Sequence, residues 1–123
     1  MPTPGRPTRF RVAFDAALLA EDANHSTPKA RTTLNQAVRD LSRHGITTSR
    51  LKACQDHGQD GTRLPGCAKT YLPAPDGPWG MVFQLRIDPD NTPFLACLAF
   101  GARHPSRPWQ PSVYQTAHQR LHT

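Results

Sequence analysis

The sequence predicts an α+β domain in which an antiparallel β-sheet is packed by N-terminal helices and by a C-terminal helix. In residues 81–87, Met81, Phe83, Leu85 and Ile87 alternate with Val82, Gln84 and Arg86, which is typical of a strand with one strongly apolar face. Residues 94–100 are apolar at every position, as in a central strand covered on both faces. Residues 28–44 carry an apolar stripe at helical spacing. A chain of 123 residues has room for one core, so we expect a single domain over residues 9–123 after a flexible segment, residues 1–8.

The N-terminal half is expected to hold one strand and two helices. Residues 10–14 alternate between large apolar side chains and basic or small ones, as in a strand that joins the later strands in one sheet. Asp15 can cap a short helix directly after this strand. Thr27 followed by Pro28 is a typical helix start and Gly45 a typical helix end, so the best-defined helix is expected between them.

The C-terminal half is expected to hold three antiparallel strands and a helix. Residues 47–62 predict only a helical turn and a polar loop rich in Gly and Asp. An edge strand is expected over residues 64–72 and should end at Pro73. After the two inner strands, the last helix is expected to start at Pro111, because proline suits the first helical position.

The charge of the chain favours a negatively charged partner. The formal net charge is +6, with 15 Lys and Arg residues against 9 Asp and Glu. A surplus of this size in a small domain indicates a polyanion or an acidic protein as partner, and charge that serves only solubility is the alternative. No apolar run has the length or flanks of a signal peptide or a membrane span. We therefore expect a cytoplasmic protein that does not enter a membrane.

The cysteines predict neither a disulfide framework nor a metal site. Three cysteines cannot all pair within the chain, and Cys97 lies in the apolar strand. Cys54, His57 and Cys67 together would leave a zinc ion one ligand short. We expect no metal ion and no cofactor.

Two strands and the last helix are expected to bring four polar side chains together: Arg103, His104, Tyr114 and His118. Cleavage of a phosphodiester by a neighbouring hydroxyl needs a base, an acid and positive charge at the phosphate. Arg103 suits the last task, because a guanidinium is always protonated and binds two oxygens at once. His104 and His118 can exchange protons near neutral pH, because an unperturbed imidazole titrates at about 6.5. Trp109, in a proline-rich loop, can stack on a base.

Three pieces of the chain follow one another in a characteristic order. They are Leu64-Pro65-Gly66 with Lys69 and Tyr71, then Trp79 to Leu85, and then Gly101-Ala102-Arg103 with Val113-Tyr114, Ala117 and Arg120-Leu121. In this order and spacing they resemble the RelE/ParE superfamily of small bacterial toxins, which belong to toxin–antitoxin pairs. In the order of its elements, the chain resembles the family from about Phe10 to Leu121.

The resemblance implies a function. Toxins of the RNA-cleaving branch enter the ribosomal A site and cut mRNA by attack of the RNA's own 2′-hydroxyl, without a metal, and a cognate antitoxin neutralises them. For this chain the resemblance implies that Arg103 binds the scissile phosphate and that Lys69 contacts another phosphate. It also implies that Tyr114 acts in proton transfer or base stacking. Arg120 is a further expected RNA contact.

One position departs from the family pattern. Many active members carry an Arg after the aromatic residue of the third strand, whereas Gly80 follows Trp79 here. Arg86 lies on the same face as Gly80 but about 20 Å further along an extended strand, and is an expected RNA contact rather than a direct replacement. Two alternatives remain: the ParE branch, which inhibits DNA gyrase by binding it, and a nucleic-acid or protein-binding module without chemistry. The absent Arg favours gyrase, and the histidines near the C-terminus favour the nuclease.

Overall fold

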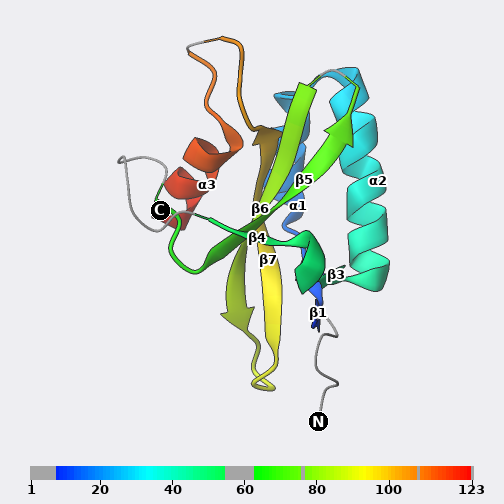
Figure 1. Ribbon diagram of the computed structural model, residues 1–123, viewed down its shortest axis with the longest axis vertical. Helices are drawn as coiled ribbons and strands as arrows, with labels where there is room; N and C mark the ends of the chain where they lie inside the picture. The colour runs from blue at the N-terminus through cyan, green and yellow to red at the C-terminus, as the bar shows by residue number, and fades with distance from the viewer. Residues whose placement is uncertain (1–7, 55–62, 76, 108, 123) are drawn as a thin grey trace.

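The structure is a computed structural model, which describes residues 8–54, 63–75, 77–107 and 109–122 (Figure 1). The N-terminal segment expected to be flexible lies outside the described residues except for Thr8, and so does most of the predicted polar loop. Within the described parts of the chain, no helix is long and apolar enough to cross a membrane. The elements are β1 (Arg9–Phe10), β2 (Val12–Ala13), α1 (Ala16–Asn24), α2 (Pro28–His44), β3 (Ile46–Thr47), a 3-10 turn (Thr48–Arg50), β4 (Lys52–Ala53), β5 (Cys67–Ala74), β6 (Gly77–Ile87), β7 (Pro93–Ala102) and α3 (Val113–Leu121).

The main sheet has five strands in the order β2-β7-β6-β5-β4. The strands β4 to β7 pair antiparallel, and β2 joins β7 in parallel, so the predicted α+β class is confirmed with a mixed sheet. The first predicted strand is divided, because the chain changes partner at Arg11. Phe10 pairs with Ile46 in a separate two-stranded sheet, whereas Val12 pairs with Leu95 of β7.

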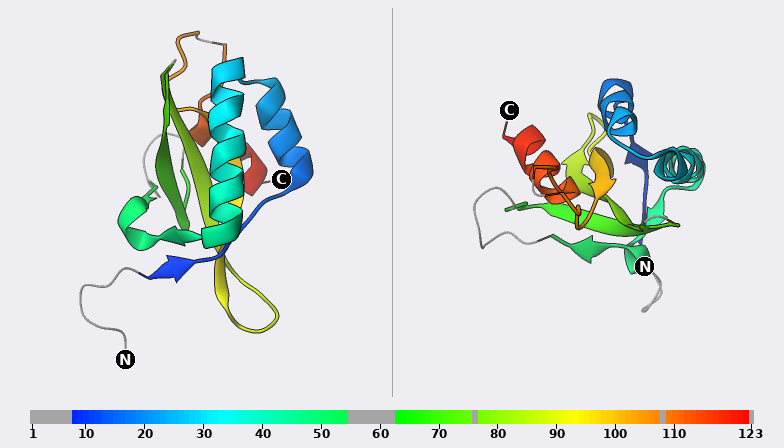
Figure 2. Two further views of the ribbon diagram at one scale, coloured as in Figure 1. Left: turned by 90° about the vertical axis from the view of Figure 1, so that its right-hand side faces the viewer. Right: turned by 90° about the horizontal axis from the view of Figure 1, so that it is seen from above.

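The helices cover the two faces of the sheet unequally. Figure 2 shows α1 and α2 on one face and α3 on the other. Each face has its own apolar cluster, and β7 contributes to both, with every residue from Leu95 to Phe100 buried. A bulge in the β6–β7 pairing after Val82 leaves Leu98 and Ala99 both in the cluster beside α3. The prediction of a central strand covered on both faces is therefore confirmed.

The predicted helix ends are confirmed for α2 and corrected for α3. The Thr27 hydroxyl accepts the Ala30 N–H in the first turn of α2, and Gly45 ends the helix with φ 65°, where a Cβ would overlap the Phe10 carbonyl. The last helix begins at Val113 instead of Pro111, because Ser112 caps it. The Ser112 hydroxyl accepts a hydrogen bond from the Gln115 N–H, and the Gln115 side-chain oxygen accepts one from the Ser112 N–H.

The strand β5 begins and ends later than predicted, at Cys67 and Ala74. It continues through Pro73 to Ala74, and Pro73 lies opposite Pro78 of β6. A proline is tolerated there because β4 pairs with β5 only around Ala68 and Lys69, so the outer edge of β5 has no strand partner at Pro73.

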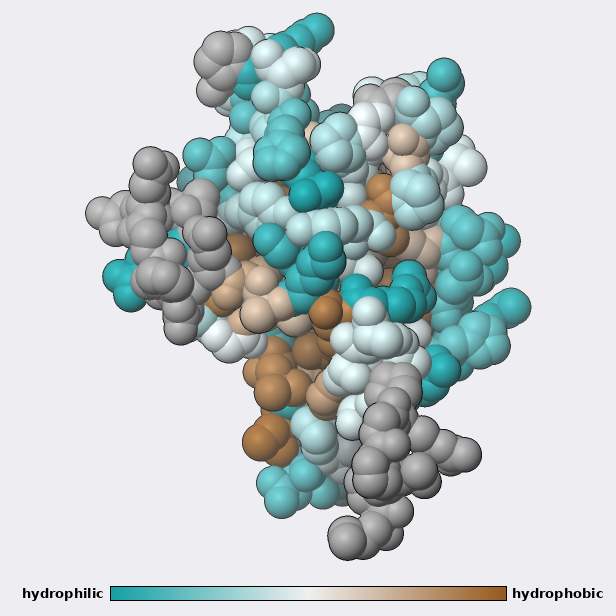
Figure 3. All heavy atoms as spheres, in the orientation of Figure 1, coloured by the Kyte–Doolittle hydropathy of each residue, from teal (hydrophilic) through white to brown (hydrophobic). Residues whose placement is uncertain are grey.

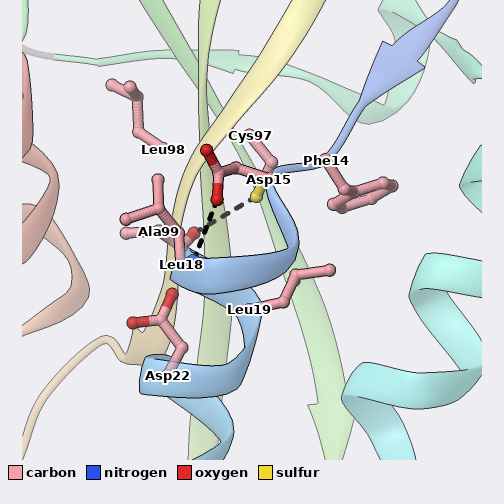
Figure 4. A pocket seen from close by; sticks show the side chains of 8 residues that line it. All are labelled: Phe14, Asp15, Leu18, Leu19, Asp22, Cys97, Leu98 and Ala99. Carbon is pink, nitrogen blue, oxygen red and sulfur yellow. Dashed lines mark hydrogen bonds between the residues drawn. The ribbon is translucent and has the colours of Figure 1, made fainter.

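A buried ion pair joins α1, β7 and α3. Arg120 donates to both carboxylate oxygens of Asp22 at 2.9 and 2.8 Å, and its Nη1 also donates to the Leu98 carbonyl at 2.8 Å. The same carboxylate accepts the Phe100 N–H of β7 at 2.9 Å. Figure 4 shows Asp22 on α1 beside the bulged part of β7. The side chain of Arg120 is only 12% exposed and its guanidinium binds acceptors within the protein, so the structure gives this predicted RNA contact a structural role.

Replacing Asp22 by Ala is expected to lower the free energy of unfolding by about 3–5 kcal/mol, because it leaves the Arg120 charge buried without its main partner. Urea denaturation of the purified protein measures the loss. Arg11→Ala is the matched control, since it removes the ion pair between Asp88 and Arg11, a side chain that is 58% exposed. For this variant the free energy of unfolding is expected to fall by about 1 kcal/mol or less. Equal losses for the two variants would contradict a structural role of the buried pair.

Candidate nucleic-acid interface

Three cationic side chains surround Tyr71 of β5 on the sheet face that carries α3. The Arg103 guanidinium carbon lies 3.5 Å from the centre of the Tyr71 ring, and the ammonium nitrogens of Lys52 and Lys69 lie 4.5 and 5.9 Å from it. Tyr114 of α3 completes the group: its hydroxyl accepts a hydrogen bond from Arg103 Nε at 3.2 Å, and Lys69 Nζ lies 4.9 Å from its ring centre. We call Lys52, Lys69, Tyr71, Arg103 and Tyr114 the cationic tyrosine cluster.

The strand pairing explains why these residues meet. Lys69 and Tyr71 are two apart on β5 and therefore point to the same face. Lys52 of β4 lies directly opposite Lys69. Arg103 follows the end of β7, where its N–H donates to the Pro78 carbonyl of β6 at 2.9 Å. Four elements distant in sequence thus each deliver a side chain to one surface.

The cluster has positive charge that the protein does not neutralise. Among the residues that the structure describes, no carboxylate forms an ion pair with Lys52, Lys69 or Arg103. Like charges directly opposite across two strands are unfavourable, and cation–π contacts of about 0.5–1 kcal/mol each offset only part of this. An anion bound between the cations would relieve the repulsion.

Arg103 is also well placed to bind such an anion. A guanidinium has five N–H groups, and only the one on Nε is used, by Tyr114. In the described part of the chain the Nη nitrogens of Arg103 have no hydrogen-bond partner. They can therefore fork onto two oxygens of a phosphate.

The structure brings three of the predicted site residues together: Arg103, Tyr114 and Lys69. The two histidines are placed differently. The His104 side chain is exposed beyond β7, and His118 Nδ1 lies 2.8 Å from the Arg63 carbonyl. Within the described residues neither imidazole hydrogen-bonds to a member of the cluster.

Two predicted RNA contacts lie on the surface with local partners. Arg86, near the far end of β6, donates to the Gln84 side chain at 2.9 Å. Trp109 is 74% exposed in the loop before α3, and the Arg107 guanidinium carbon lies 5.4 Å from its ring centre. Neither contacts the cluster through a hydrogen bond or a cation–π pair in the described structure.

Sequence reasoning missed Lys52 and Tyr71 as site residues. Tyr71 could have been found, because it shares the strand face of Lys69 at a spacing of two. Lys52 gave no signal, since it lies in a stretch without clear periodicity and reaches the cluster only through the pairing of β4 with β5.

The surface around the cluster is open and mainly hydrophilic. Figure 3 looks at the molecule from the side on which β4 and β5 lie in front, and it shows hydrophilic side chains over the middle of this surface. Hydrophobic side chains gather toward the lower end, and β6 exposes Leu85 and Ile87, at 51% and 65%.

Comparison with known proteins gave one similar structure and no family assignment. No family model matches the chain, and no curated protein matches it. The chain is similar to the solved structure of a double arginine-to-alanine mutant of the E. coli toxin RelE in the free state. The identity is 18%, the TM-score is 0.46, and the match covers 93% of this chain and 99% of that chain. We therefore argue function from the residues of the cluster.

The salt dependence of single-stranded RNA binding should identify the cations that meet phosphates. Lys52→Ala, Lys69→Ala and Arg103→Ala are each expected to make the slope of log K against log salt shallower by about 0.7, because each removes one phosphate contact. Fluorescence titration at several salt concentrations measures the slope. Arg31→Ala is the matched control, since Arg31 is exposed on α2 at the opposite face of the sheet. A change of the same size in Arg31→Ala would mean that binding follows net charge and not the cluster.

Proposed function

We propose that the chain is a RelE-like bacterial toxin that cuts mRNA without a metal, with the cationic tyrosine cluster as its site. One observation supports this above all: three cations with no carboxylate partner in the described structure converge on two tyrosines. Single-stranded nucleic acid binds to surfaces that combine positive charge with aromatic side chains. The combination of Arg, Lys and Tyr also includes groups that can stabilise and protonate a reacting phosphate.

Binding is divided among the cations. In this proposal Arg103 forks onto the scissile phosphate with its Nη nitrogens, and Lys52 and Lys69 contact phosphates on either side. Arg103 and Lys52 already lie 3.5 and 4.5 Å from the centre of the Tyr71 ring, so stacking on a base falls to Trp109, which is 74% exposed. The net charge of +6 favours association with the ribosome, and it also favours an antitoxin with an acidic segment.

The proposed reaction uses the same residues. The 2′-oxygen attacks the adjacent phosphorus, a bond to phosphorus forms, and the bond from phosphorus to the 5′-oxygen of the next nucleotide breaks, leaving a cyclic phosphate. Arg103 stabilises the charge that develops on the phosphate. Tyr114 accepts from Arg103 Nε, so its own O–H proton can go to the leaving 5′-oxygen. His104, which directly follows Arg103 along the chain, is the proposed base for the 2′-hydroxyl.

Expression of the wild type in a bacterial host should arrest growth and produce new 5′ ends in cellular RNA, whereas Arg103→Ala should do neither. Loss of one group that stabilises transition-state charge lowers cleavage by about 10²–10³. Mapping of RNA 5′ ends measures the cuts, and Arg31→Ala, away from the cluster, should cut like the wild type.

Cleavage in vitro tests the chemistry separately. A substrate with a 2′-deoxy nucleotide at the mapped site should resist cleavage, because the attacking hydroxyl is missing, and a chelator should have no effect. Arrest without RNA cuts would replace the nuclease by the gyrase-inhibiting alternative. Absence of both growth arrest and RNA cuts would favour the alternative of a binding module without chemistry.

A further inference from the structure

The side chain of Arg103 crosses β6 directly above Gly80. In the sheet, Tyr71, Gly80 and Gly101 form one row across β5, β6 and β7. A Cβ at Gly80 would lie 3.2 Å from Cγ and 3.3 Å from Cδ of Arg103. The aliphatic stem of Arg103 therefore rests on the Gly80 backbone, and this places the guanidinium on the Tyr71 ring.

Space, and not backbone conformation, is what position 80 requires. Its φ lies outside the left-handed region that favours glycine, in contrast to Gly45, Gly66 and Gly77. Adjacent strands lie about 4.8 Å apart, so a side chain that starts at β7 must cross all of β6 to reach β5. It can do so close to the sheet only where β6 carries no side chain.

We propose that Gly80 is a positioning residue that lets the side chain of Arg103, which follows β7, cross β6 and bring its guanidinium to Tyr71. A Cβ at position 80 would lie 3.2 Å from Cγ of Arg103 and 3.2 Å from the Thr70 carbonyl oxygen, so a larger side chain there competes with the Arg103 stem for the space above β6. Arg86 does not replace this cation, because it lies six residues beyond Gly80 and donates a hydrogen bond to the Gln84 side chain.

This inference rests on the proposed RNA binding, and it predicts that the effect of one substitution changes sign. Gly80→Arg adds a positive charge, yet it should weaken binding of a 2′-O-methyl RNA oligonucleotide about tenfold, because it displaces Arg103 from the cluster. In the Arg103→Ala background the same substitution should strengthen binding about threefold or more, because the space is now open and the new guanidinium can occupy it.

Titration of the four proteins, the wild type, the two single variants and the double variant, decides the matter. A substitution that only destabilises the fold would weaken binding in both backgrounds and would overturn the proposal. Tighter binding by Gly80→Arg in the wild-type background would overturn it as well, because charge alone would then decide affinity.

A second measurement does not depend on RNA. In the NMR spectrum of the free wild type, the δ-protons of Arg103 should be shifted upfield by the Tyr71 ring, and Tyr71→Leu should remove the shift. Gly80→Ala should reduce it, whereas Gly101→Ala should leave it, since a Cβ at Gly101 meets Val113 at an ordinary 3.5 Å. An unshifted wild type, or a shift unchanged in Gly80→Ala, would overturn the role of Gly80. A wild type that shows the upfield shift of the Arg103 δ-protons but does not bind RNA would overturn the proposed function and not the role of Gly80.

Discussion

The buried ion pair between Asp22 and Arg120 is the interaction on which the candidate site depends. The helix α3 has nine residues, and an isolated helix of this length is marginal in water. Its position is set by Arg120 at one end and by Val113 and Ala117, which are buried against the sheet. Tyr114 lies one residue after Val113 and meets Arg103 only in this position. The geometry of the surface cluster is thus held from the opposite side of β7, where α1 supplies the carboxylate.

The protein treats its charges in two contrasting ways. The interior cation, Arg120, donates hydrogen bonds to the Asp22 carboxylate and to the Leu98 carbonyl. The charged groups of the cluster contact tyrosine rings and one phenol oxygen, and no carboxylate forms an ion pair with them in the described structure. A fold selected for stability alone would not place Lys52 opposite Lys69. Arrangements that destabilise the folded state and have no compensating contact nearby are typical of functional sites.

Much of the fold could be predicted, because burial leaves a periodic pattern in the sequence. The strand β7 and the helix α2 were predicted from apolar runs and caps that depend on local sequence alone. The division of β1 from β2 could not be predicted, since a change of partner at Arg11 leaves the alternation of side chains unchanged. The pairing of Lys52 with Lys69 could not be predicted either, because it depends on how β4 aligns with β5 and not on the sequence around either residue.

The candidate site was predicted in part, for the same physical reason. Arg103 follows the end of a recognisable strand and Tyr114 lies at the start of a recognisable helix, so their proximity could be expected. Arg120 was assigned to RNA because a cation near the end of a basic chain looks the same whether it faces solvent or a carboxylate 98 residues away. At Gly80 the sequence shows only a glycine, and the structure shows that the space above it is used by Arg103.

The resting position of Arg103 is also the position in which it can bind a phosphate. Its flat face lies on the Tyr71 ring, and stacking uses the π-surface of the guanidinium and not its N–H edges. The bond from Nε to Tyr114 fixes rotation about the side-chain axis and leaves the Nη edge directed away from that bond. A phosphate that arrives at this edge needs no contact to be broken. A long arginine side chain normally loses conformational entropy when it binds, and here most of that loss has already occurred on folding. Binding energy can then go to the phosphate instead of to ordering the residue that holds it.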